Sequence, residues 1–149
     1  MSAREVRALR NAWLTEVQAI AIYQAEVALL KVTPWTQRRR VTLELCQIIL
    51  GEECEHQSWI EALDPDLARH PMLTHIYRLT GYLVGVALGF FPYWISWRLH
   101  SLAEIQAEAA YLHAEKTVRD AKTQSLLRLA AEQERRHSVR FKEVLRATR

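Results

Sequence analysis

The sequence has little glycine, proline or cysteine. Its 149 residues include four glycines, four prolines and two cysteines. So few turn-forming residues exclude a many-stranded sandwich or barrel and favour a small number of long helices. Half of the residues are hydrophobic and a quarter are charged, so we expect no long disordered stretch and a single domain over residues 1–149.

The two cysteines, Cys46 and Cys54, form no Cys-x-x-Cys pair. Eight residues along one helix separate two Cα atoms by about 12 Å, which is beyond disulfide reach. We therefore expect two free, buried thiols in a reducing compartment. The first ten residues are charged and lack the apolar core of an export signal, so no cleaved signal is expected.

Positive charge exceeds negative charge only slightly, with 20 Lys and Arg against 17 Asp and Glu. The basic residues are spread along the chain, and the one tight run is 38–40. That run fits either a solvated helix start or a contact with an anionic lipid or acidic partner. Because there is no clustered basic helix and no aromatic platform, nucleic acid is not an expected partner.

Hydrophobic periodicity predicts an all-α chain with four long helices. They are expected at about residues 4–32, 35–63, 92–117 and 120–146. Pro34 and Pro65 stop the first two helices, Pro92 suits the first turn of the third, and Asp120 suits the N-cap of the fourth. Residues 66–78 are expected to form a short mixed segment.

Two Glu-x-x-His motifs stand on predicted helices, Glu53 with His56 and Glu134 with His137. Residues three apart lie on one helical face, one turn apart, so a carboxylate and an imidazole can reach the same metal ion. The motif alone is a weak signal in a chain this rich in glutamate. Its weight therefore depends on the spacing of further carboxylates.

That spacing matches a di-iron bundle, which needs one Glu from each of two helices and Glu-x-x-His from the other two, at one height. The midpoint between Glu16 and Glu53 falls on the Pro34-Trp35 turn, so an antiparallel hairpin brings both carboxylates level, each about 27 Å from the turn. The midpoint between Glu104 and Glu134 falls beside the break before the last helix. The stretch 64–91 supplies a long connection between the two hairpins.

The helix neighbours of Glu16 and Glu104 are apolar: Leu9, Trp13, Ile20 and Tyr23 for the first, and Trp97, Ile105 and Tyr111 for the second. A carboxylate on an apolar face must be paired, protonated or metal-bound. We therefore expect a metal site, with unrelated ion pairs as the alternative. Glu108 lies one turn beyond Glu104, and the spacing accepts either as a ligand. Glu26, Glu52 and Glu55 are expected to be solvated. Glu52 or Glu55 could instead hydrogen-bond to a metal ligand and support it.

At residues 11–141 the sequence resembles the demethoxyubiquinone hydroxylase family of ferritin-like di-iron proteins. The segments EVQAIAIY and AEIQAEAAY are similar to the family's first-helix and third-helix motifs, and EECEH and EQERRH to those of the second and fourth helices. The resemblance selects Glu104 over Glu108. The metal ligands it implies are Glu16, Glu53, His56, Glu104, Glu134 and His137.

The resemblance implies a ferritin-like four-helix bundle of two antiparallel hairpins, with a long, partly helical apolar crossover between the second and third helices. It also implies a monooxygenase that uses two iron ions, O₂ and two electrons from NADH or a reductase to hydroxylate a polyprenylated benzoquinone or quinol in ubiquinone biosynthesis. The protein would be peripheral on the cytoplasmic face of the inner membrane, with a homo-oligomer and a lipid-binding accessory protein as further partners. Tyr23 and Tyr111, two turns from Glu16 and Glu104, should point inward as catalytic residues in electron or proton transfer, or as packing residues.

Some positions depart from the family pattern. Ala109 and Ala110 stand where the family usually has histidines, and 135–138 is less acidic than the family motif. These departures concern the route of the electrons and the substrate. A ferritin-like or rubrerythrin-like oxidase or peroxidase acting on soluble peroxide or iron is therefore an alternative, and a metal-free lipid-binding bundle is a second.

Residues 79–97 form an uncharged stretch of nineteen residues, the length at which a spanning helix is considered. Pro92, the glycines and the scattered aromatic residues oppose spanning. We expect an interfacial helix that lies in one leaflet and admits a prenyl tail, with burial in an interface as the alternative. Gly81, Gly85 and Gly89 give one small-residue face that a helix or a prenyl chain can approach.

Overall fold

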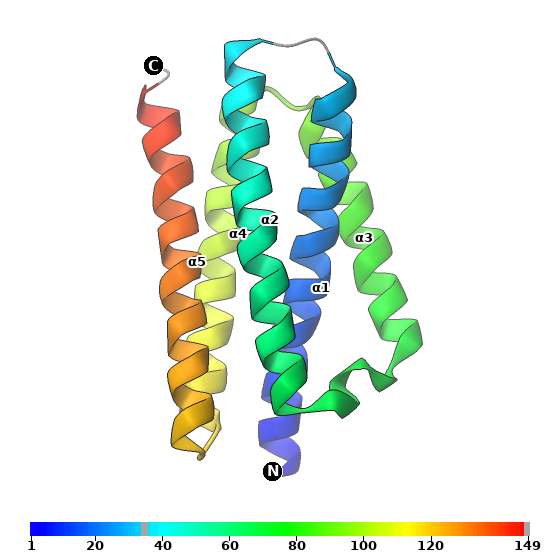
Figure 1. Cartoon of the computed structure of the whole chain (residues 1–149), viewed down its shortest axis with the longest axis vertical. Coiled ribbons are helices and arrows are strands. Elements are labelled where there is room, and N and C mark those ends of the chain that lie inside the picture. The colour runs from blue at the N-terminus through cyan, green and yellow to red at the C-terminus, as the bar shows by residue number, and fades with distance from the viewer. Residues whose placement is uncertain (34–35, 148–149) are drawn as a thin grey trace.

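The structure is a computed structural model that describes residues 1–33 and 36–147, with only the backbone at residues 68 and 69. Within these residues the chain is all-helical and contains no strand, as the sequence predicted. The elements are α1 (Ala3–Val32), α2 (Gln37–Leu63), the short 3₁₀ helix η1 (Pro65–Arg69), α3 (Pro71–Phe90), α4 (Tyr93–Thr117) and α5 (Ala121–Ala147) (Figure 1). The predicted Pro34-Trp35 turn lies outside the described residues.

Four of the helices form a bundle, and α3 lies outside it (Figure 1). α1 and α2 form one antiparallel hairpin, and α4 and α5 form the other. Because α2 and α4 run in the same direction, the chain must return along the bundle between them. α3 makes this return and packs against α1.

Polar caps set the ends of the helices where the sequence predicted them. Ser2 and Glu5 form a capping box at the start of α1, and Thr36 accepts a hydrogen bond from the amide of Arg39 at the start of α2. Asp120 Oδ2 accepts from the amide of Thr123 at 2.8 Å, which confirms its predicted role before the last helix.

The prediction for residues 66–78 is wrong, because α3 begins at Pro71 and runs through most of that segment. Proline suits this first turn, where its missing N–H has no helical partner. The apolar stretch 79–97 is divided at Pro92, close to where the sequence predicted the start of the third long helix. α3 ends at Phe90 and α4 begins at Tyr93, and the two helices run in opposite directions (Figure 1). None of the described helices combines the length and apolar character needed to cross a membrane.

The glycine face of α3 lies against α1. A Cβ atom at Gly85 would lie 2.2 Å from the carbonyl oxygen of Ile22, and one at Gly81 would lie 2.5 Å from that of Gln18. The glycines therefore permit close contact with another helix. Elsewhere α3 and the following turn expose large apolar side chains: Met72, Ile76, Leu79, Tyr82, Leu83, Val84, Phe90 and Phe91.

Two groups of apolar side chains fill the bundle, one around Trp13 and Leu127 and the other around Trp97 and Phe141. Two expectations of burial are wrong. Ile105 is 40% exposed, because it follows Glu104 by one residue and so lies about 100° around α4 from the buried face. Cys54 is exposed, whereas Cys46 is buried, and both are free thiols.

Candidate metal centre

The structure brings together all six side chains that the sequence singled out as metal ligands. Each is at most 4% exposed. Their ligand atoms form two overlapping groups in which all atoms lie within 4.8 Å of one another. The groups are Glu16, Glu53, His56 and Glu134, and Glu53, Glu104, Glu134 and His137.

Glu53 and Glu134 belong to both groups. Nδ1 of His56 lies 3.0 Å from a carboxylate oxygen of Glu134 and 3.6 Å from one of Glu53. Nδ1 of His137 lies 3.2 Å from the other oxygen of Glu53 and 3.4 Å from the other oxygen of Glu134. Each shared carboxylate therefore turns one oxygen toward each histidine, so Glu53 and Glu134 each contribute an oxygen to both ligand groups.

The outer nitrogens of both histidines are held by other side chains. Nε2 of His56 lies 2.7 Å from Oε1 of Gln133, and Nε2 of His137 is hydrogen-bonded to Glu52, which Arg140 also contacts at 3.1 Å. When each Nε2 donates to its oxygen partner, the neutral imidazole has a free lone pair on Nδ1, facing the centre. The support from Glu52 was foreseen as an alternative to its solvation, whereas Gln133 was missed.

The two tyrosines point inward, as the seven-residue spacing predicted. The Tyr23 hydroxyl donates to Glu104, and the Tyr111 hydroxyl donates to Glu16. Each of these hydrogen bonds joins α1 to α4, so the carboxylates of Glu16 and Glu104 are each held by a tyrosine of the other helix. Burial raises the pKa of both phenols, so both keep their protons. Glu108 is half-buried and belongs to neither group.

The centre contains buried polar atoms that the protein does not satisfy. Among the described residues, seven buried side-chain nitrogen or oxygen atoms have no hydrogen-bond partner, and six of them belong to Glu16, Glu53, His56, Glu134 and His137. Unpaired buried polar groups are rare in native proteins because each costs about 1–3 kcal/mol. Their concentration at one place fits a site that is completed by bound cations.

Without cations, protons take their place. Burial and the nearby Glu53 carboxylate raise the pKa of Glu16, and burial also raises that of Glu104. Burial opposes the charge on the imidazoles, but their close ion-pair contacts with the buried glutamates outweigh it and raise the pKa of His56 to about 10 and that of His137 to about 12. Two divalent cations would balance the charge of the four carboxylates, and carboxylates with imidazoles are ligands that suit Fe(II).

A cavity of about 220 Å³ between α1 and α4 reaches the centre. Its walls include four of the six candidate ligands, together with Tyr23 and His100. Gln18 and Ile22 also line it, and their carbonyl oxygens lie against Gly81 and Gly85 of α3. The cavity therefore lies next to the crossover helix.

One prediction about the other glutamates is wrong. Glu26 is 1% exposed rather than solvated, and it lies with Cys46 and His100 in a separate buried group. A signal for this was available, because Glu26 follows Tyr23 by three residues and precedes Leu30 by four, which places it on the buried face of α1. Glu55 is exposed, as expected.

No protein-family model, curated protein or solved structure matches this chain. The geometry of the carboxylate centre is therefore the main indication of function.

Proposed function

We propose that this chain is a ferritin-like di-iron carboxylate protein. The observation that carries the proposal is the pair of overlapping ligand groups that share Glu53 and Glu134, with a histidine on each side and unsatisfied atoms between them. The ligands come from all four bundle helices, which form two antiparallel hairpins joined by one long crossover. This arrangement is in keeping with the ferritin-like class.

We propose further that the protein is a monooxygenase that hydroxylates the ring of a polyprenylated benzoquinone or quinol of the demethoxyubiquinone type. When bound, two iron ions would supply the activation of O₂, with two electrons from NADH or a reductase. The chain contributes fixed carboxylates and imidazoles. Tyr23 and Tyr111 contribute phenolic protons, which they donate in hydrogen bonds to Glu104 and Glu16, respectively.

The crossover supports a lipid substrate. A cavity of about 220 Å³ is smaller than the ~300–1,000 Å³ of sites that enclose drug-sized ligands, so it suits a ring but not a long tail. The tail would lie outside, along the exposed apolar side chains of α3, next to the cavity. In this proposal the same side chains, with part of 79–97, rest on the cytoplasmic surface of the inner membrane.

The test is iron analysis of the folded protein together with extraction of bound lipid. We expect about two iron ions per chain, as two-metal sites require, and a co-purifying quinone. Less than one iron per folded chain after reconstitution would overturn the di-iron assignment.

Glu53→Ala and His137→Ala should each abolish iron-dependent quinone turnover and keep the helix content, whereas Glu55→Ala, on the exposed side of α2, should keep full activity.

A di-iron oxidase or peroxidase acting on soluble peroxide or iron is the second candidate. The small volume of the cavity favours it, because O₂ and peroxide need no room for a ring. The two candidates differ in their need for a quinone. Iron-dependent consumption of peroxide at the same rate with and without a quinol would favour the oxidase.

A further inference from the structure

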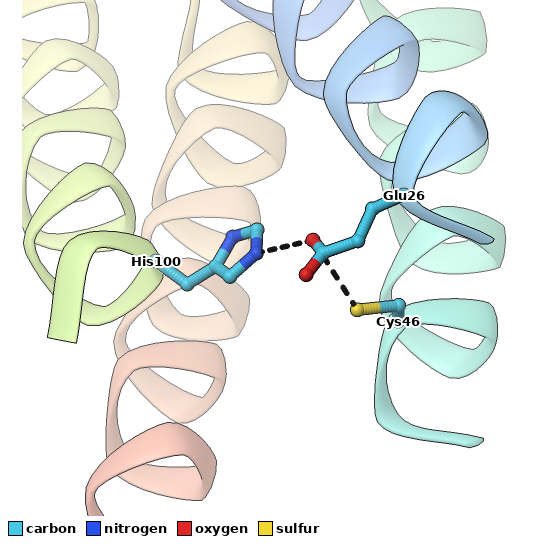
Figure 2. Close-up of side chains that lie close together, drawn as sticks. All are labelled: Glu26, Cys46 and His100. Carbon is cyan, nitrogen blue, oxygen red and sulfur yellow. Dashed lines mark hydrogen bonds and ion pairs between the residues drawn. The ribbon is translucent and has the colours of Figure 1, made fainter. Parts of the chain in front are cut away.

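A second group of metal-binding side chains lies deep in the bundle. Glu26 comes from α1, Cys46 from α2 and His100 from α4, and their side chains point toward one another (Figure 2). None is more than 2% exposed. Cys46 precedes Glu53 by seven residues, so this group lies about 10 Å along the bundle from the carboxylate centre.

The distances in this group fit one small ion. Nε2 of His100 lies 2.6 Å from Oε2 of Glu26, and Sγ of Cys46 lies 3.8 Å from the same oxygen. All three ligand atoms lie within 4.8 Å of one another. A tetrahedral zinc ion, with bonds of about 2.0–2.3 Å, keeps its ligand atoms roughly 3.3–3.8 Å apart, so small side-chain rotations would suffice.

The neighbouring residues hold two of these ligands in place. Ser96 Oγ donates to Oε1 of Glu26 at 3.1 Å, which leaves Oε2 turned toward the cysteine and the histidine. The His100 ring is stacked between Tyr23 and Phe141, with ring centroids at 5.0 and 4.8 Å. Such support of the ligands from behind is typical of metal sites.

We propose that Glu26, Cys46 and His100 form a mononuclear site for a divalent ion of the zinc type. One thiolate, one imidazole and one carboxylate are a ligand set that zinc accepts, and three protein ligands leave a fourth position open. His100 binds as the neutral imidazole, and Cys46 releases its thiol proton to solvent as the metal–sulfur bond forms. The ion links three helices of the bundle.

A second cavity gives this site an entrance. It has a volume of about 670 Å³ and reaches inward to Glu26, Thr42 and Ser96, with Arg38 and Tyr93 among its other lining residues. An ion can therefore reach Glu26 from solvent through this cavity, without passing through the carboxylate centre.

The sulfur ligand allows a test of this site alone, because metal bound at the carboxylate centre has no thiolate ligand. The chain has two cysteines, and neither is among the six ligands of that centre. The full-length protein is loaded with Co²⁺, and thiolate-to-cobalt charge-transfer absorption is recorded. We expect this absorption in the wild type with one cobalt–thiolate site per chain, its loss in Cys46→Ser, and its retention in Cys54→Ser, the exposed control.

A further variant shows whether the second site fails independently of the proposed di-iron function. Glu53→Ala, which disrupts the carboxylate centre, should keep the cobalt–thiolate absorption. Absence of the band in the folded wild type would overturn the second site, and so would its survival in Cys46→Ser or its loss in Cys54→Ser. Should Cys46→Ser fail to fold, the band in the wild type and in Cys54→Ser still assigns it, because Cys46 is then the remaining thiol.

Discussion

The bundle buries two groups of titratable side chains about 10 Å apart, and they differ in whether their polar atoms find partners within the protein. The carboxylate centre concentrates six nitrogen and oxygen atoms that have none. In the smaller group, Oε2 of Glu26 meets His100 and Cys46, and Oε1 meets Ser96. Among the described residues, no buried nitrogen or oxygen of that group lacks a hydrogen bond.

The two groups therefore differ in their need for bound cations or protons. The carboxylate centre places four buried carboxylates around two imidazoles, and such an arrangement is stable only when cations or protons neutralise it. The smaller group can exist with or without an ion, because its hydrogen bonds already satisfy it. We therefore expect substitutions in the first group to change metal binding most, and substitutions in the second to change the stability of the metal-free protein.

The largest expected effect is that of Glu134→Ala. Glu134 takes part in both ligand groups, so its loss should weaken the binding of both ions by more than about 100-fold, beyond what loss of a supporting residue costs. Glu104→Ala should weaken mainly one ion, because Glu104 belongs to one group. Titration with Fe²⁺ under anaerobic conditions measures both. Equal losses in the two variants would contradict the shared role of Glu134.

The next effect tests the smaller group. Glu26→Ala should lower the free energy of unfolding of the metal-free protein by about 3 kcal/mol, because it leaves the donors of His100 and Ser96 buried without an acceptor. Glu55→Ala, on the exposed surface, should change it by less than about 0.5 kcal/mol. Denaturant unfolding measures both changes. A value for Glu26→Ala close to that of the control would show that the network does not stabilise the bundle.

Sequence spacing was sufficient to predict the height and the helices of the carboxylate centre. Glu16 and Glu53 lie at equal distances from one turn, Glu104 and Glu134 lie at equal distances from another, and straight helices preserve that arithmetic. Glu-x-x-His spacing also fixes which face each motif presents. These are local properties of helices, and the structure does bring the six side chains together.

The rest depended on contacts between distant segments. The spacing of Glu26 places it on the buried face of α1, but nothing local marks Cys46 as more than a packing thiol. The meeting of these two side chains with His100 depends on how three helices pack. The partner of the crossover helix also depended on packing. Pro92 marked a break, but that the glycine face of α3 would lie on α1 follows from the return of the chain along the bundle.

A smaller effect concerns the residues that support the histidines. Gln133→Leu removes the partner of His56, and loss of such a partner typically costs about 10–100-fold in metal affinity. Glu52→Gln keeps a hydrogen-bond acceptor for His137 but removes the charge, so about tenfold or less is expected. Glu132→Gln, an exposed neighbour, is the control. Competition with a chelator gives the affinities, and a larger loss in Glu52→Gln than in Gln133→Leu would reverse the ranking.

The metal-free and metal-loaded states of the carboxylate centre should also differ in their pH dependence. In the metal-free folded protein the pKa of His56 is raised to about 10 and that of His137 to about 12, whereas unfolded histidine has a pKa of about 6.5. The folded state therefore keeps protons that the unfolded state releases above about pH 6.5. This contribution to stability is complete below that pH and is lost as the pH rises toward 10. The Tm of the chelated protein should fall between about pH 6.5 and 9.

We expect metal ions to reverse this trend, because in the proposed site they bind the same Nδ1 atoms and must displace the protons. The stabilisation that Fe²⁺ gives under anaerobic conditions should therefore grow as the pH rises over the same range. Thermal unfolding with and without metal, at matched ionic strength, measures both slopes. Chelated protein whose Tm is constant or rises with pH would show that the two histidines do not hold protons in place of cations. The unsatisfied atoms of the centre would then need another explanation.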